Sequence, residues 1–294
     1  MLLIPGEPIV ILPRDPGLAP QASGAPAIAA WAAASLGVPT TFLGGVGADD
    51  AGDLIRATLA AVVADPSAIV TKAGLPTATA RVDYDPDGSR RFDFHVAGSA
   101  ATALDLSDLD RRPEQATWVH VSGSALLFGG TTTATVVEAV RRGRAAGATV
   151  SVDPNLRAEL DDPAGLAAVR RLCEQADVLF PSEGELEALG LDEDHLVGAG
   201  TAVCRTMAAD GARLRAGRLD LTIPAVAPAE QVVDPDGAGD TFAGAVIAAR
   251  MRGSTWGDAI RAASQVVARA ITVAGPMTMT LRPADLVLPT AAGE

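Results

Sequence analysis

The sequence predicts a three-layer α/β fold: a central, mostly parallel sheet flanked by helices, with a small β lid outside these layers. Strand-like and helix-like segments alternate along most of the 294 residues, which is typical of a parallel sheet covered by helices. A hydrophobic content of 48% is ample for a buried core and excludes a disordered chain. The alternation breaks at about residues 74–98, which we expect to form most of the lid, with a contribution from about residues 8–24. Residues 1–294 are expected to form a single domain.

Short apolar or β-branched runs predict the strands. The first run, Leu2–Ile4, is closed by Pro5 and Gly6, and the run Thr40–Leu43 leads into a glycine-rich segment. In chain order, strands are expected at Leu2–Ile4, Ile9–Leu12, Thr40–Leu43, Trp118–Ser122, Thr149–Val152, Val178–Phe180, Ala202–Thr206 and, as an edge strand, Leu219–Val226.

Helices are predicted between most of these strands. The segment Ala25–Leu36 is rich in alanine, and Gly37 follows at the position of a helix C-cap. Residues 13–24 are rich in Pro, Gly and Ala and are predicted to be a loop. Helices are expected at Ala25–Leu36, Asp50–Val63, Ser124–Gly143, Ala164–Gln175, Glu183–Leu189, Thr241–Arg252 and Trp256–Thr272.

The lid is predicted from a hairpin pattern. Thr77–Tyr84 and Arg91–His95 are strand-like, and residues 85–88 between them read Asp-Pro-Asp-Gly, a turn signal. Because an isolated hairpin is marginally stable and gains from pairing, the chain could form a homodimer through this lid.

Composition excludes several classes of function. The formal charge is −13 and aromatic residues make up 3%, so we expect no nucleic-acid partner. Cys173 and Cys204 form neither a C-x-x-C pair nor a disulfide framework, which favours a cytoplasmic location. The N-terminal segment lacks the basic region of a signal peptide, and no apolar stretch is long enough to span a bilayer, so no membrane association is expected.

The strongest chemical motif spans residues 234–245, with the sequence DPDGAGDTFAGA. Gly237, Ala238 and Gly239 lead into an apolar helix, where small residues let the backbone approach a ligand and unpaired N–H groups can hold an anion. Asp240 follows in the same turn and could take a proton from a hydroxyl that attacks a phosphoryl group. The alternative is a glycine-rich turn whose aspartate stabilises the helix dipole.

Two further groups of polar residues follow predicted strands, where ligands bind in open parallel sheets. Arg157 offers a planar fork for phosphate oxygens and Asn155 can donate or accept beside it, although a strand-ending Asx turn with a solvated arginine explains the same residues. Ser182 and Glu185 have the spacing of a helix capping box.

The string at residues 234–245 resembles the C-terminal signature of the PfkB, or ribokinase-like, sugar kinases, and the resemblance covers nearly the whole chain. The family pattern D-[TP]-x-G-A-G-D-x-F is matched by Asp234, Pro235, Gly237, Ala238, Gly239, Asp240 and Phe242. The resemblance implies a ribokinase-like fold with Asp240 as catalytic base. It also implies an anion hole at Gly237, Ala238 and Gly239, and a monovalent-cation site near Asp234.

The same resemblance implies ATP and Mg²⁺ as cofactors, and leaves K⁺ as a further cation. Asn155 and Arg157 match the family motif D-x-N-x-R. Glu185 matches the glutamate of N-x-x-E, which organises Mg²⁺ through water in the family, whereas Ser182 replaces the usual asparagine.

A third motif in this comparison is the nucleotide loop T-x-G-x-x-G. Thr206 and Gly211 match it, but Ala208 replaces the first glycine. If that position needs a positive φ, alanine strains it by about 1 kcal/mol or more.

The sugar end departs most from the family pattern. Gly24 and Gly45 fall where the family lines its sugar pocket. Ser23 replaces a glycine, Ile28 replaces an asparagine, and Ile11 stands where an aspartate is frequent. A site that loses two hydroxyl-binding groups loses part of its selectivity for hydroxyls.

The function implied by the resemblance is ATP-dependent phosphorylation of a hydroxyl on a small-molecule sugar or sugar acid. The lid segments Pro76–Ala80 and Asp87–Phe94 look most like those of fructokinases and 2-keto-3-deoxygluconate kinases. Two alternatives remain open: a nucleoside kinase of the same fold, and a binding or regulatory relative with little kinase activity.

Overall fold

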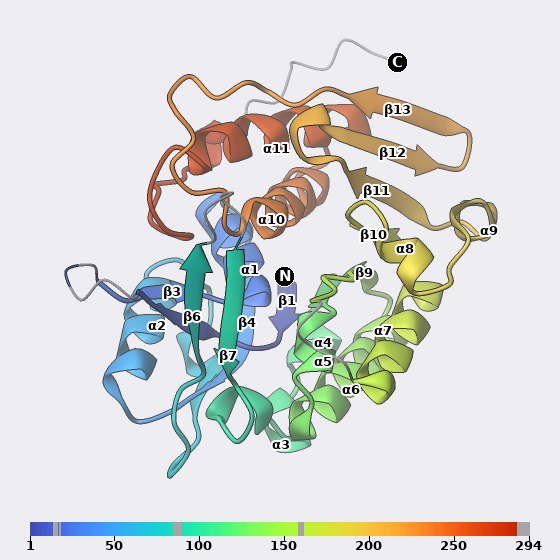
Figure 1. The fold of residues 1–294 in the computed structure, drawn as a ribbon. Coiled ribbons are helices and arrows are strands. Elements are labelled where there is room, and N and C mark those ends of the chain that lie inside the picture. The colour runs from blue at the N-terminus through green and yellow to red at the C-terminus, as the bar shows by residue number, and fades with distance from the viewer. Residues whose placement is uncertain (14–16, 18, 85–89, 158–161, 287–294) are drawn as a thin grey trace.

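The chain folds into three layers, a large sheet between two groups of helices, and a second, smaller sheet packs beside them (Figure 1). This computed structural model describes residues 1–13, 17, 19–84, 90–157 and 162–286. The predicted three-layer α/β fold with a mostly parallel sheet is therefore confirmed.

The large sheet has nine strands. In spatial order they are β13 (Leu219–Ile223), β12 (Ala212–Ala216), β11 (Ala202–Thr206), β10 (Val178–Leu179), β9 (Thr149–Asp153), β8 (Trp118–Ser122), β1 (Leu2–Pro5), β4 (Thr40–Val46) and β5 (Ile69–Thr71). The neighbours from β11 to β5 are parallel, whereas β12 and β13 are antiparallel. The chain leaves β1 toward β4 and later returns on its other side at β8, so the strand order reverses between β1 and β8. Ligands bind at such a switch point.

Alternate side chains of the parallel strands pack into two separate hydrophobic cores. Leu2 and Ile4 of β1 pack with the first core, and Leu3 between them packs with the second. Strands buried on both faces need apolar residues at every position, which explains their continuous apolar runs.

Helices cover each face of the large sheet. The first core is built with α1 (Ala25–Ser35), α2 (Asp50–Ala60), α10 (Ala238–Met251) and α11 (Trp256–Ala270). The second is built with α3 (Leu106–Leu109), α5 (Ser124–Leu127), α6 (Gly130–Ala145), α7 (Pro163–Gln175), α8 (Glu185–Ala188) and α9 (Glu193–Gly198), and α4 (Arg112–Gln115) lies beside α6. Within the described residues, no helix is both long and apolar enough to cross a membrane.

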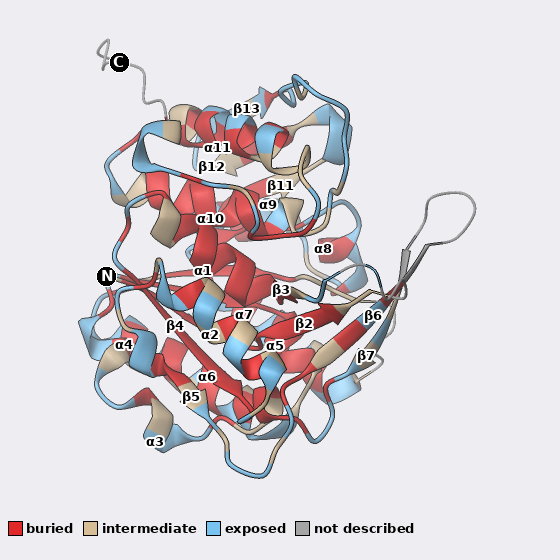
Figure 2. Ribbon diagram, turned by 90° about the vertical axis from the view of Figure 1, so that its left-hand side faces the viewer, coloured by how far each residue is buried: buried red, intermediate tan, exposed pale blue. Residues whose placement is uncertain are grey.

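Helices α1 and α10 are buried almost all round (Figure 2). Every residue from Ala25 to Ala33 is buried, and alanine lets this helix lie close to its neighbours. The closest approach is at Gly244 of α10, where a Cβ atom would lie 2.5 Å from the carbonyl oxygen of Ala29. This contact fixes α10, which begins at the site described below, against the sheet layer.

A second sheet, which we call the lid sheet, has four strands in the order β3 (Gln21–Ser23), β2 (Ile9–Leu12), β6 (Thr79–Tyr84) and β7 (Arg90–His95). β6 and β7 pair antiparallel, as the hairpin pattern predicts, and the predicted turn at residues 85–88 lies outside the described residues. The expectation that residues 13–24 form only a loop is wrong, because Gln21–Ser23 pairs with β2.

Other predicted boundaries need correction. The single helix expected over Ser124–Gly143 is two helices, because Gly129 and Gly130 adopt φ of 75° and 70°, outside the helical region. The helix expected at Glu183–Leu189 is shorter, and α10 begins three residues before Thr241, at Ala238. The sequence analysis missed β5, β12, α9 and the short helices α3 and α4.

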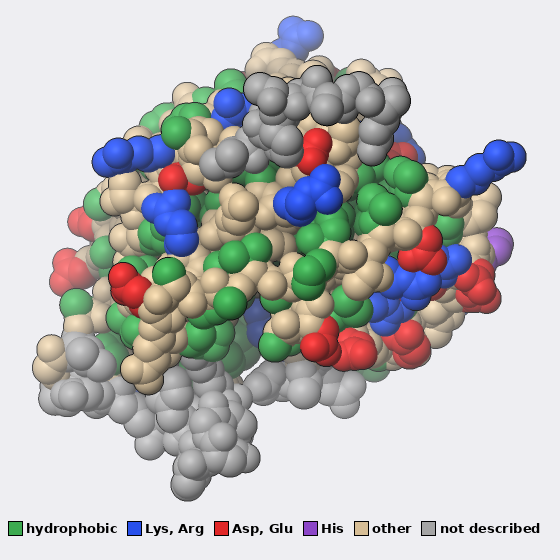
Figure 3. Space-filling model, turned by 90° about the horizontal axis from the view of Figure 1, so that it is seen from above, with side chains coloured by type: hydrophobic (Ala, Val, Ile, Leu, Met, Phe, Trp, Pro, Cys, Tyr) green, Lys and Arg blue, Asp and Glu red, His purple; other side chains and the backbone are tan. Residues whose placement is uncertain are grey.

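Charged side chains of both signs are interspersed over the face formed by α11, β12 and β13 (Figure 3). Nearby, Arg205 lies 2.6 Å from Glu193, and Arg215 lies 2.6 Å from Asp194. These pairs join β11 and β12 to α9.

The packing at Gly244 generates a stability prediction. Gly244→Ala should lower the free energy of unfolding by about 1–3 kcal/mol, because the new methyl group overpacks the α1–α10 contact. Urea unfolding measures the change. Gly198→Ala is the matched control, because Gly198 is helical and a Cβ there meets nothing within 4 Å. That variant should be neutral or more stable by up to about 1 kcal/mol. Equal effects of the two substitutions would contradict the packing argument.

Candidate active site

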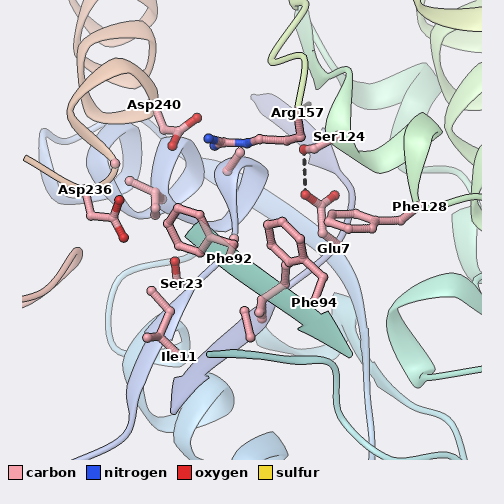
Figure 4. A pocket seen from close by; sticks show the side chains of 16 residues that line it. Glu7, Ile11, Ser23, Phe92, Phe94, Ser124, Phe128, Arg157, Asp236 and Asp240 are labelled. Atoms are coloured by element: carbon pink, nitrogen blue, oxygen red, sulfur yellow. Dashed lines mark hydrogen bonds between the residues drawn. The ribbon is translucent and has the colours of Figure 1, made fainter. Parts of the chain in front are cut away.

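The candidate active site lies where the carboxyl ends of the parallel strands meet the first turn of α10 and the lid sheet. Two adjoining cavities occupy this place, and Arg157, Asp236, Gly237 and Asp240 line both of them. We call the one under the lid sheet the lid cavity and the one over the strand ends the strand-end cavity (Figure 4 shows the lid cavity).

The first turn of α10 is shaped by small residues. Gly237 is its N-cap with φ 70°, and its carbonyl oxygen accepts the first helical hydrogen bond from the N–H of Thr241 at 2.8 Å. A Cβ at Gly239 would meet nothing within 4 Å, so a ligand can approach the backbone there. Ala238 and Gly239 line the strand-end cavity. Free N–H groups at a helix N-terminus favour an anion.

Asp240 is buried at this helix end, with 7% of its surface exposed. The side-chain amide of Asn155 donates to its Oδ1 at 2.9 Å. Burial raises the pKa of Asp240 to about 6, the Asp236 and Glu185 charges act in the same direction, and Arg157 and the Asn155 hydrogen bond oppose the rise. A carboxylate with this pKa is mostly ionised at neutral pH and accepts a proton more readily than an ordinary aspartate.

Two more carboxyl groups line the strand-end cavity: Asp153, the last residue of β9, and Glu185, which follows β10. Glu185 accepts the N–H of Leu156 on Oε1 and that of Ser182 on Oε2, each at 2.7 Å. The capping box that the spacing of Ser182 and Glu185 predicts does not form, because Gly184 is the N-cap of α8 and the second bond closes the turn before that helix. Asp153 lies in the same cavity, and burial together with the Glu185 and Asp240 charges raises its pKa well above the usual range.

The strand-end cavity has a volume of about 260 Å³, and Asn155, Ser182, Glu185 and Thr206 are among its lining residues. In the described part of the chain, no three His, Cys, Asp or Glu side chains are placed to hold a metal ion by themselves. The carboxylates present nevertheless suit Mg²⁺, which prefers oxygen ligands and usually keeps waters and phosphate oxygens in its shell.

Thr206, Ala208 and Gly211 lie in and after β11, and of these three Thr206 alone is among the described residues that line the lid cavity or the strand-end cavity. Ala208 adopts φ 47°, so the position does require the left-handed region that alanine disfavours. Gly211 has φ 100°, and a Cβ there would overlap the carbonyl oxygen of Ile223. Both residues shape the turn between β11 and β12.

Asp234 is not among the residues that line the lid cavity or the strand-end cavity, although Asp236, two residues on, lines both. Its Oδ1 accepts the N–H of Asp236 and its Oδ2 accepts the N–H of Gly275, both at 3.0 Å. The carboxylate thereby ties together two loops that approach the first turn of α10.

The two glycines expected at the sugar site, Gly24 and Gly45, have different surroundings in the structure. Gly24, with φ 106°, lines the lid cavity. Gly45 does not lie among the described lining residues; a Cβ there would overlap the carbonyl oxygen of Ala100, so this glycine allows β4 to pack against that backbone.

Sequence reasoning missed several residues of the lid cavity. The rings of Phe92, Phe94 and Phe128 line it, and Glu7 is buried at its edge with 1% of its surface exposed. Burial raises the pKa of Glu7 to about 8, and Ser124 Oγ donates to its Oε1 at 2.6 Å. Glu7 could have been found from the sequence, because it follows the first strand as closely as the other site residues follow theirs.

Comparison with known proteins finds relatives over most of the chain. A family model described as "pfkB family carbohydrate kinase" matches residues 14–282. A fructokinase from Rhizobium leguminosarum bv. trifolii is 30% identical over 265 residues, which cover 84% of this chain and 79% of that protein.

Solved structures resemble the whole fold. A putative ribokinase II from E. coli in complex with ATP and Mg²⁺ superposes with a TM-score of 0.87 and 31% identity, covering 97% of each chain. A double mutant of the fructokinase of Vibrio cholerae O395, with fructose, ADP and potassium ion bound, has a TM-score of 0.85 and 30% identity, covering 97% of this chain and 96% of that one.

The positive φ at Ala208 generates a second prediction. Ala208→Gly should raise the free energy of unfolding by about 1 kcal/mol, because glycine removes the left-handed strain. Urea unfolding tests it, with Ala209→Gly as control. Ala209 follows in the same short turn without a positive φ, so its substitution should destabilise the protein slightly. A loss of stability in Ala208→Gly as large as in the control would contradict the assignment of strain.

Proposed function

This chain belongs to the PfkB family of carbohydrate kinases, and we propose that it transfers the γ-phosphoryl group of ATP to a primary hydroxyl of a neutral, fructose-like sugar with Asp240 as general base. One observation carries the proposal. Asp240 is a buried carboxylate that lines both cavities at the N-terminus of α10, so it can contact an acceptor in one and a phosphoryl donor in the other.

In this proposal the sugar enters the lid cavity and directs its hydroxyl at Asp240. The carboxylate accepts the hydroxyl proton as the oxygen attacks phosphorus. The backbone N–H groups of Gly237, Ala238 and Gly239 would hold the developing negative charge on the transferred group, and the Ala238 N–H, which donates to the Pro235 carbonyl oxygen at 3.2 Å, would exchange that bond for the phosphoryl oxygen. Arg157, which lines both cavities, would neutralise phosphate oxygens and orient them with its planar fork.

ATP would place its phosphates in the strand-end cavity. Asn155, Ser182 and Thr206 line that cavity and offer polar side chains to the nucleotide, while the turn at Ala208 and Gly211 bounds β11 beside it. Mg²⁺, when bound, supplies positive charge to the phosphate oxygens. Glu185 would orient waters of that ion.

A monovalent cation such as K⁺ would lie near Asp234, where the loops around Asp236 and Gly275 converge. Backbone carbonyl oxygens of such loops are suitable ligands for a monovalent cation. The Vibrio cholerae O395 fructokinase structure contains a bound potassium ion, which supports a monovalent cation for this chain but not a particular position.

Charge favours a neutral acceptor over a sugar acid. Among the described residues of the lid cavity, Arg157 is the one cation, and it faces the carboxylates Asp236 and Asp240. A further carboxylate on the substrate would add repulsion to this site. Phosphorylation of a keto-deoxy sugar acid therefore ranks below that of a fructose-like sugar, which the fructokinase relatives also favour.

Dimerisation through the lid stays a prediction. β7 is one of the two edge strands of the lid sheet, and such an edge offers unpaired backbone groups to a second copy.

The assignment of the base predicts the effect of Asp240→Asn. Turnover should fall about 10²- to 10⁴-fold, because the amide cannot accept the hydroxyl proton. Coupled ADP release with Mg²⁺-ATP, K⁺ and fructose measures kcat. Asp236→Asn is the matched control, because Asp236 lines the same cavities. It should lose less than about tenfold. A large loss in the control with near-normal turnover in Asp240→Asn would move the base to Asp236.

The raised pKa of Asp240 predicts the pH dependence. A base acts in its ionised form, so kcat/KM for the sugar should rise with pH and reach half its maximum near the Asp240 pKa of about 6. Asn155→Ala removes a hydrogen bond that stabilises the ionised form, so the half-maximum should move to higher pH. An unchanged or lower midpoint in Asn155→Ala would contradict the role of this hydrogen bond.

A further inference from the structure

Glu7 is an unusual residue in the lid cavity, because its carboxyl group is buried and one of its two oxygens has no hydrogen-bond partner among the described residues. It follows β1 and is 1% exposed. Its Oε1 accepts the Ser124 hydroxyl, but its Oε2 is fully buried and has no hydrogen-bond partner among the described residues. A buried polar atom without a partner costs free energy, so it points to a ligand or a function.

The carboxyl group is held in place from behind. Ser124 Oγ lies 2.8 Å from Ser122 Oγ and 2.6 Å from Glu7 Oε1, so a short chain of hydroxyls runs from the end of β8 to Glu7. This chain engages Oε1, whereas Oε2 is buried without a partner among the described residues, beside the cavity that Glu7 lines. Burial raises the pKa of Glu7 to about 8, so near neutral pH the group is mostly protonated and can both donate and accept a hydrogen bond.

The wall between Glu7 and Asp240 is largely apolar. Figure 4 shows Glu7 with Ser124 on one side of the cavity, Asp240 on another, and the phenyl rings beside them. The rings of Phe92 and Phe94 stack with centroids 5.5 Å apart, and Phe128 packs on Phe94 edge-on at 5.2 Å. Ile9, Ile11 and Ile28 extend this apolar surface, and Ser23 adds one hydroxyl to it.

Such a wall selects against hydroxyl groups in the middle of an acceptor. Each hydroxyl that is buried against Ile or Phe side chains loses its water and gains no partner, which is unfavourable. The acceptor that fits is polar at both ends and apolar between them.

We propose that Glu7 is a specificity-determining residue that binds an oxygen of the acceptor remote from the phosphorylated hydroxyl, and that the acceptor is a neutral deoxy sugar. This inference rests on the proposed function and names the substrate class of that same site. Glu7 Oε2 contacts the remote oxygen, Asp240 contacts the reacting hydroxyl, and the carbon that lacks a hydroxyl faces the Ile and Phe side chains.

Matched sugar pairs test the substrate class. Coupled ADP release and sugar-induced thermal shift are measured with D-fructose and 1-deoxy-D-fructose, D-glucose and 2-deoxy-D-glucose, and D-ribose and 2-deoxy-D-ribose. Each deoxy sugar keeps a primary hydroxyl. At least one deoxy sugar should exceed its parent about tenfold or more in kcat/KM. Parents that equal or exceed their deoxy partners in all three pairs would overturn the proposed substrate class.

Variants of Glu7 test its role on the best sugar of the panel. Glu7→Met removes both polar functions and should raise KM for the sugar at least about tenfold while KM for ATP changes less than about threefold. Glu7→Gln keeps a donor and an acceptor and should recover most of that loss. Ser264→Ala, which removes a buried hydroxyl in α11 bonded to the Ile260 carbonyl, controls for general destabilisation and should leave the sugar KM unchanged.

The outcomes separate the inference from the proposed function. Turnover of parent sugars with an unaltered sugar KM in Glu7→Met would overturn the inference and leave the kinase assignment standing. Should Glu7→Met fail to fold, a sugar KM in Ser124→Ala equal to that of the wild type would overturn it equally, because the Ser124 hydroxyl holds the Glu7 carboxyl group in place. No turnover and no thermal shift with any sugar would overturn both.

Discussion

The structure depends most on one arrangement: a carboxylate buried at the N-terminus of a buried helix. Asp240 is 7% exposed, yet Asn155, Arg157 and the first turn of α10 compensate part of the cost of its charge. The free-energy cost of the buried charge that remains appears as a raised pKa of Asp240, and a raised pKa is the property that a general base needs near neutral pH. In the proposed function, the surroundings that bury Asp240 are therefore also those that make its carboxylate basic enough to accept the hydroxyl proton.

The rest of the fold holds this helix end against the strand ends. Helices α1 and α10 approach closely at Gly244, and Gly237 caps α10 beside Ile28 of α1. The parallel strands β1, β8, β9, β10 and β11 then deliver polar residues to one edge of the sheet. The lid sheet covers that edge from the other side with Phe92 and Phe94. Each layer thus contributes one wall of the two cavities.

The sequence was informative where local chemistry determines structure. Apolar runs located most strands, and the rule that ligand-binding residues follow parallel strands identified Asn155, Arg157, Glu185 and Thr206, which the structure brings to one cavity. Long-range packing was not readable in the same way. Nothing local distinguished Gly45, which packs against Ala100, from Gly24, which lines the lid cavity. The wall of Phe92, Phe94 and Phe128 likewise joins segments that are distant in the chain.

The central claim is that Asp240 is a buried base whose ionisation controls catalysis, and it can be measured directly. Carbon-13 NMR titration of the aspartate side-chain carboxyls, with the Asp240 signal assigned by its loss in Asp240→Asn, gives its pKa in the free protein. The account predicts a value of about 6 that coincides with the midpoint of the kcat/KM profile. A pKa near the ordinary aspartate value of about 4, or a profile that does not follow the titration, would contradict it.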